Sequence, residues 1–317
     1  MTQTTSTELA VSLTGAVKAY GSVRAVDGLD LSIPRGETVA LLGRNGAGKS
    51  TAISLMLGLN EPDGGQALLF GRPPGETVRQ GRVGAMLQDG RAISRVTVRE
   101  LVTFIATAYP EPLPVDEALE LAGLTELAER RVDRLSGGQV QRTRFAVALA
   151  GNPELIMLDE PTAALDVEAR HAFWHSMRMY AARGNTVLFS THYLEEADDN
   201  ADRIVVIDRG RLVAEGSGEE LRRAAGGTVV SFDLRGRGSE GLGQLPGVTS
   251  VEIHGDRARL SSDDSDATVR ALARADAIHG LQVTAVSLDD AFLTLTSRLE
   301  PAGSARAASS PRLERTR

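Results

Sequence analysis

Apolar and polar residues alternate along the first part of the chain, from Val11 to Ile33. A period of two is typical of antiparallel strands that bury one face. Gly15, Gly21 and Gly28 interrupt the alternation and predict turns between these strands. The following segment, "ETVALLG", is mostly apolar and leads through a glycine-rich loop into "KSTAISLMLGL", which has helical periodicity. A buried strand followed by a helix indicates a parallel sheet covered by helices.

Helical periodicity dominates residues 88–150, in the segments "VRELVTFIATAY", "VDEALELAGL" and "QVQRTRFAVALAG". Buried strands then resume as "ELIMLDE", "NTVLFST" and "DRIVVID", and the helical pattern "VEARHAFWHSMRMYAARG" lies between the first two. The pattern therefore predicts an α/β domain that carries a mostly helical insert.

The pattern of apolar and polar residues changes beyond "RRAAGGT" and predicts about four short strands and two helices. Such a mixture is typical of a small α+β domain. We expect a disordered leader at 1–8, the main domain at 9–225, an accessory domain at 226–300 and a disordered basic tail at 301–317.

The composition argues against several classes of protein. Lys and Arg total 35 against 42 Asp and Glu, a net charge of −7, whereas a nucleic-acid binder should be basic. The absence of cysteine excludes disulfides, thiolate metal sites and cysteine nucleophiles. The N-terminus lacks a secretory signal pattern, and the apolar runs are of strand length. We expect a soluble cytoplasmic chain with no nucleic-acid partner.

A phosphate-binding loop stands between the first buried strand and its helix. The stretch from Gly43 to Ser50, "GRNGAGKS", fits the pattern G-x-x-x-x-G-K-[ST] in the strand–helix context which that pattern requires. Its glycines allow backbone N–H groups to surround phosphates. Lys49 can place a charge at the β- and γ-phosphates, and the Ser50 hydroxyl can bind Mg²⁺.

Two further motifs point to the chemistry of phosphates. In "LIMLDEP", Asp159 and Glu160 follow a buried strand, where ligands bind in α/β proteins. Asp159 can hold Mg²⁺ through water, and Glu160, the next residue, points in a different direction and can orient or deprotonate an attacking water. Taken alone, such an acidic pair is more often a helix N-cap. In "DRLSGGQVQR", Ser136 and two glycines at a helix start offer a second anion cradle.

Together, the phosphate loop, "LSGGQ" and "LIMLDEP" resemble the nucleotide-binding subunit of an ATP-binding cassette (ABC) transporter over residues 9–225. The resemblance implies an α/β P-loop NTPase fold with an ABC ATPase core: a parallel sheet, N-terminal antiparallel strands and a helical insert, plus the small C-terminal α+β domain. It implies ATP and Mg²⁺ as cofactors. It further implies a head-to-tail homodimer, in which each ATP lies between the phosphate loop of one chain and the Ser-Gly-Gly helix start of the other.

Further positions take their roles from the same resemblance. Gln88 in "MLQDG" matches the glutamine that contacts Mg²⁺ and the attacking water, and His192 in "STHYLEEA" matches the switch histidine. The loop "TAALD" matches the segment that crosses the dimer interface, and Tyr20 matches the aromatic residue stacked on adenine. The catalytic set is Glu160, His192 and Gln88, and the metal ligands are Ser50, Gln88 and Asp159. The predicted nucleotide contacts are Tyr20, Gly43, Asn45, Gly46, Gly48, Lys49, Ser50, Thr51, Ser136, Gly137, Gly138, Gln139 and Asp166.

The segment "VSLDDAFLTLT" near the C-terminus resembles ATPase subunits of drug and polyketide (ABC-2 type) exporters. It can also be read as a strand and an amphipathic helix that close a small domain. The leading hypothesis is an ATPase that drives a separate polytopic permease from the cytoplasmic face of the cell membrane, exporting a hydrophobic compound or lipid. The alternatives are an importer subunit and a cassette ATPase acting on ribosomes or DNA.

Overall fold

A computed structural model describes residues 8–88, 95–163, 165–225, 227–276 and 278–297. The chain forms two compact units, Met1–Leu221 and Arg222–Arg317. The leader predicted at 1–8, except for its last residue, and the tail predicted at 301–317 lie outside the described residues. The domain limits predicted from composition stay a prediction.

The first unit opens with a three-stranded antiparallel sheet in the order β2-β1-β4, made of β1 (Leu9–Tyr20), β2 (Val23–Pro34) and β4 (Gly64–Leu69). Only one of the three predicted turns forms, at Gly21, between β1 and β2. Gly15 and Gly28 instead lie inside the strands with positive φ, and the register shifts beside Gly15. The N–H of Gly15 donates to Asp30 Oδ1 at 2.7 Å. A glycine bulge lets each strand continue instead of turning.

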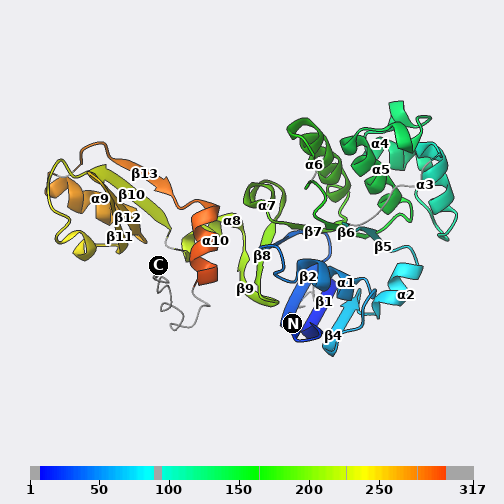
Figure 1. Cartoon of the computed structure of the whole chain (residues 1–317), viewed down its shortest axis with the longest axis horizontal. Helices are drawn as coiled ribbons and strands as arrows, with labels where there is room; N and C mark the ends of the chain where they lie inside the picture. Colours follow the sequence, from blue (N-terminus) through cyan, green and yellow to red (C-terminus); the bar gives the residue numbers. More distant parts are fainter. Residues whose placement is uncertain (1–7, 89–94, 164, 226, 277, 298–317) are drawn as a thin grey trace, which may run out of the picture. The chain divides into compact units, whose positions relative to one another are not determined.

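A six-stranded sheet forms the second layer (Figure 1). In spatial order its strands are β5 (Val83–Met86), β6 (Leu155–Asp159), β7 (Thr186–Thr191), β3 (Thr38–Leu42), β8 (Arg203–Asp208) and β9 (Arg211–Gly216). All neighbours are parallel except β8 and β9. Every residue of β3, β6 and β7 is buried, as the apolar runs predicted. Helix α1 (Lys49–Met56) contacts strands of both sheets, and its apolar residues join their common core.

The helical insert gathers three helices that pack against one another (Figure 1). They are α3 (Val98–Ala106), α4 (Val115–Leu121) and α5 (Gly137–Leu149), which confirms the helices expected from periodicity. Both α3 and α5 begin with a capping box, in which the N-cap hydroxyl and the side chain three residues later bond each other's backbone N–H. The remaining helical segments are α2 (Pro74–Arg79), η1 (Thr125–Leu127), η2 (Val132–Arg134), α6 (Val167–Ala181) and α7 (Leu194–Asn200).

An aromatic cluster joins α5, α6 and β7. Phe145, Phe173, Trp174, Tyr180 and Phe189 meet edge to face, with ring centroids 4.7 to 6.4 Å apart. This geometry suits the quadrupoles of the rings and adds to the free energy of burial. The Tyr180 hydroxyl donates to the Pro153 carbonyl at 2.7 Å, just before β6. The cluster therefore packs α5 and α6 against β7 and the segment just before β6.

The second unit is a small α+β structure, as its pattern predicted. Its antiparallel sheet has the order β11-β12-β10-β13. The elements, in chain order, are α8 (Gly218–Ala224, which begins in the first unit), β10 (Thr228–Asp233), η3 (Leu242–Gln244), β11 (Val248–His254), β12 (Arg257–Ser262), α9 (Ser265–Arg274), β13 (Gln282–Ala285) and α10 (Leu288–Ser297). Val230, Phe232, Leu260 and Leu272 are fully or almost fully buried and form a core between the sheet and α9.

Candidate nucleotide-binding site

The phosphate loop runs from the end of β3 to the start of α1, as predicted. Two of its glycines leave no room for a side chain: a Cβ on Gly43 would lie 2.5 Å from the Ile207 carbonyl oxygen. At Gly48, where φ is +106°, a Cβ would lie 2.1 Å from the carbonyl oxygen of Ala25. Close approach of backbone to backbone therefore requires glycine at both positions.

Lys49 is the first residue of α1, and only 5% of it is exposed. Its Nζ donates to the Gly43 carbonyl at 2.7 Å and lies 3.4 Å from the carbonyl oxygen of Arg44. It also lies 3.3 Å from Glu160 Oε1. Two carbonyl oxygens of the loop thus surround Lys49, together with the carboxylate after β6 that the sequence predicts as the catalytic base.

Glu160 has an unusual backbone, with φ at +49° directly after β6. This conformation is uncommon for a residue with a side chain and persists only where neighbours hold it. Here the Glu160 N–H donates to Ser190 Oγ at 2.9 Å, and Ser190 Oγ donates to Asp159 Oδ1 at 2.5 Å. The bend sends the two adjacent carboxylates in different directions, as predicted, and Glu160 Oε2 lies 2.6 Å from Nδ1 of His192.

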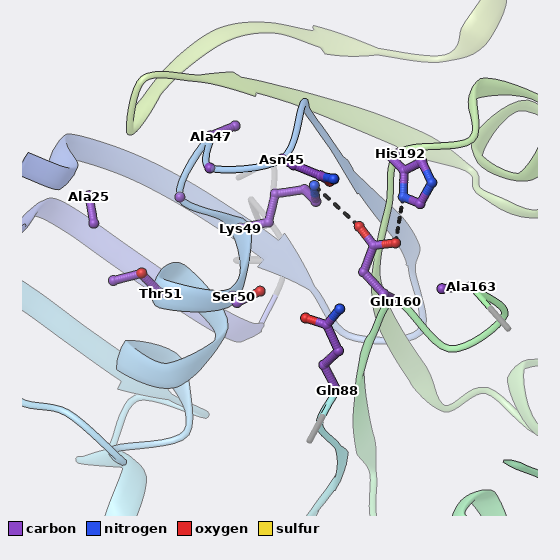
Figure 2. Close-up of a pocket in the computed structure, with 12 residues that line it drawn as sticks. Ala25, Asn45, Ala47, Lys49, Ser50, Thr51, Gln88, Glu160, Ala163 and His192 are labelled. Carbon is purple, nitrogen blue, oxygen red and sulfur yellow. Dashed lines mark hydrogen bonds and ion pairs between the residues drawn. The ribbon is translucent and has the colours of Figure 1, made fainter. Parts of the chain in front are cut away.

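These groups line one cavity of about 350 Å³ (Figure 2). Of the predicted site residues, the lining includes Asn45, Gly46, Gly48, Lys49, Ser50, Thr51, Gln88, Glu160 and His192. Segments far apart in the sequence thus meet at the carboxyl ends of the parallel strands, where α/β proteins bind their ligands.

Other predicted residues do not line this cavity. Tyr20 is half exposed at the end of β1, and Asp159 is buried against Ser190. Ser136, Gly137, Gly138 and Gln139 form the start of α5, away from the lining. Asp166 is the N-cap of α6, where its Oδ1 accepts from the N–H of Ala169 at 2.8 Å. The roles assigned to these residues stay predictions.

The sequence interpretation missed four residues of the site. Ala25, Ala47 and Ala163 line the cavity, and Ser190 bonds the Asp159 carboxylate and the backbone N–H of Glu160. The alanines carry no chemical signal, because they contribute only space. Ser190 could have been found, since a hydroxyl inside the otherwise apolar run "TVLFST" needs a hydrogen-bond partner when buried.

Comparisons with known proteins agree with this geometry. Residues 26–163 match the family described as ABC transporter. The Nod factor export ATP-binding protein I of Rhizobium sp. (strain N33) is 36% identical over 301 residues, which cover 92% of this chain and 98% of that protein. The daunorubicin/doxorubicin resistance ATP-binding protein DrrA of Streptomyces peucetius is 38% identical over 306 residues, covering 90% and 92%.

A solved dimeric ATP-binding cassette in a post-hydrolysis state, bound to ADP and Pi, superposes with a TM-score of 0.59. It is 27% identical and covers 65% of this chain and 98% of its own. The chain belongs to the ABC transporter family, as an ATP-binding subunit. It binds and hydrolyses ATP to power a transporter, and cassettes of this kind pair as dimers.

Proposed function

We propose that the chain is the ATPase subunit of an exporter of hydrophobic, drug-like compounds or lipids. The two relatives described above support this proposal, because the name of one states export of Nod factor and that of the other states resistance to daunorubicin and doxorubicin. Their similarity covers nine-tenths of the chain or more, and so must include most of the C-terminal unit. None of the helices in the described part of the chain has the length and apolar character of a membrane span. The membrane pathway is therefore assigned to a separate polytopic permease, to which this subunit attaches on the cytoplasmic face.

The observation that supports the proposed roles of the catalytic residues is the convergence of Lys49, Glu160 and His192 on one cavity beside the phosphate loop (Figure 2). Lys49 binds the β- and γ-phosphates. Glu160 takes the proton of the attacking water, and His192 stands 2.6 Å from Glu160, within reach of the same centre.

Ser50 and Gln88 supply hydroxyl and amide oxygens at the cavity, whereas Asp159 does not line it and would hold an ion only through water. Two oxygen donors of this kind fit Mg²⁺, which is held by a few protein ligands, water and phosphate. When bound, Mg²⁺ neutralises charge that develops on the phosphates.

In a head-to-tail homodimer, the second anion cradle, at the start of α5, would face a phosphate group. Ser136 and Gly137 are exposed, and neither they nor Gly138 and Gln139 line the cavity of their own chain. The first N–H groups of a helix lack acceptors within that helix and carry partial positive charge. In the proposed dimer, they bind the γ-phosphate of the ATP held by the partner.

Glu160→Gln tests this proposal. The amide keeps the size of the side chain but cannot accept a proton, so ATP should bind and the closed dimer should persist. We expect dimer elution with ATP and monomer elution with ADP in size-exclusion chromatography with light scattering, and ATP turnover reduced by about a hundredfold or more. Monomer elution of this variant with saturating ATP would contradict the proposed dimer.

A further inference from the structure

We propose that Arg170 is a positioning residue which, through Tyr193, holds His192 in the orientation that reaches Glu160. This inference rests on the proposed function, because it takes the histidine as part of the hydrolytic site. The contacts that carry it lie within the first unit and connect α6, the end of β7 and the start of α7.

The anchor of this arrangement is Glu196, a carboxylate on α7 that is only 5% exposed. Its Oε1 accepts from the Thr162 hydroxyl at 2.5 Å, and its Oε2 accepts from the Thr191 hydroxyl at 2.9 Å. Both threonines are almost fully buried. Arg170 Nε lies 3.3 Å from Glu196 Oε1, an ion pair that lacks the geometry of a hydrogen bond. A buried carboxylate is costly unless it is paired, so the charge of Glu196 keeps the Arg170 guanidinium beside it.

The guanidinium of Arg170 also lies over an aromatic ring. Its Cζ is 5.1 Å from the ring centroid of Tyr193, within the range of a cation–π contact. The backbone of Tyr193 is fixed as well, because its N–H donates to the Thr191 hydroxyl at 3.0 Å. Cation, ring and backbone therefore leave Tyr193 little freedom.

The Tyr193 ring in turn supports the histidine. The two ring centroids lie 4.1 Å apart with their planes tilted by 38°, and His192 Nδ1 lies 2.6 Å from Glu160 Oε2. About a third of the His192 side chain is exposed, so burial alone does not fix its rotamer. The adjacent Tyr193 ring limits the orientations that His192 can adopt, and Arg170 holds that ring in position.

The same arginine touches the segment assigned to the dimer interface. A terminal nitrogen of Arg170 lies 3.5 Å from the Leu165 carbonyl oxygen, one residue before Asp166. If this segment moved, it would shift Arg170 first, and Arg170 would shift His192 through the Tyr193 ring. This places the proposed positioning residue between the interface loop and the hydrolytic centre.

Arg170→Met tests the inference, with Arg178→Met as the matched control. Arg178 lies on the same helix and also bonds α7, through Asn200 Oδ1 at 2.6 Å, but its contact is exposed. We expect Arg170→Met to lower kcat for ATP by about tenfold while KM changes less than about twofold, because a small misplacement of a reacting group slows chemistry. Arg178→Met should keep kcat near wild type.

A double-mutant cycle with His192→Ala separates positioning from a general structural effect. If Arg170 acts through the histidine, Arg170→Met should slow the His192→Ala enzyme no further in single-turnover hydrolysis. Equal fold losses in both backgrounds would overturn the inference. If Arg170→Met impairs folding, as judged by thermal unfolding, Tyr193→Leu replaces it in the same cycle and should give the same result.

The two hypotheses fail in different ways. Wild-type turnover of His192→Ala would overturn the histidine's role in the proposed function. A strong loss in His192→Ala, with Arg170→Met no slower than Arg178→Met, would overturn the positioning role alone.

Discussion

At the scale of single residues, the geometry of this site depends on contacts that no local pattern encodes. The motif "LDEP" predicted two carboxylates with different directions, and Asp159 and Glu160 do diverge. Their divergence follows from the positive φ of Glu160, which Ser190 on the neighbouring strand stabilises. Because that serine lies 30 residues away in sequence, the type of residue was predictable, whereas the pairing required the sheet register.

Tyr180 gives a prediction at the same scale. Its buried hydroxyl donates to the Pro153 carbonyl, and Tyr180→Phe would leave this carbonyl without that partner. We expect the free energy of unfolding to fall by about 1 kcal/mol at neutral pH. Urea denaturation followed by circular dichroism measures it, and an unchanged midpoint and slope would contradict the structural role of this hydrogen bond.

The same pair of proteins tests a pH dependence. Burial raises the pKa of the Tyr180 phenol above its ordinary value, and the negative charge of Glu154 adds to this effect. The unfolded chain therefore releases this proton near pH 10 while the folded chain keeps it, so stability falls as pH rises beyond about 10. Urea denaturation from about pH 8 to about pH 11 should show a steeper loss of the free energy of unfolding for wild type than for Tyr180→Phe. Parallel losses would contradict the raised pKa.

At the scale of elements, two helix starts share one local structure and differ in their surroundings. Both α3 and α5 begin with a capping box, formed by Thr97 with Glu100 and by Ser136 with Gln139. At α5, a Cβ on Gly138 would lie 2.6 Å from the Cβ of Ala169, so the helix start packs closely on the first turn of α6. The start of α5 is thus tied to the helix that begins at the interface loop.

Ser136→Arg should therefore act on the partner's site and leave the variant's own phosphate loop intact. The long cationic side chain blocks close approach of a second chain, so we expect ATP turnover to fall by about a hundredfold, with the Kd of the monomer for ATP unchanged. Thr97→Arg is the matched control, because it removes an equivalent cap, worth about 1 kcal/mol, from α3. Equal turnover of the two variants would refute the shared site.

The sheets show which elements a sequence pattern can define. Mostly apolar runs predicted β3, β6 and β7, since such runs are typical of strands that are buried on both faces in a parallel sheet. The glycines at 15 and 28 misled the interpretation of the N-terminal segment, because a glycine with positive φ forms either a turn or a bulge. Pairing with β4 along the other edge of β1 decides for the continuous strand.

At the scale of the whole molecule, the question is which membrane protein is driven by the ATP hydrolysis of this subunit. Affinity purification of tagged Glu160→Gln from detergent-solubilised native membranes with ATP answers it, with the same bait without nucleotide as control. We expect mass spectrometry to identify a stoichiometric polytopic permease. A copurifying solute-binding protein would contradict export, and ribosomal proteins in place of a permease would contradict the role in transport.

Because Lys49 contacts Glu160, a nucleotide that binds here replaces the Glu160 carboxylate with phosphate as the anion beside the Lys49 ammonium. Glu160 acts as the counter-ion of Lys49, with its carboxylate 3.3 Å from the ammonium and on the same chain. A tethered group acts at a high effective concentration, so dilute monovalent anions compete with it poorly. A polyphosphate brings several charges and also bonds the loop N–H groups, and so displaces it. The Lys49–Glu160 pair thereby favours a polyphosphate over a monovalent anion, and binding of the polyphosphate would free Glu160 for its proposed role as the base.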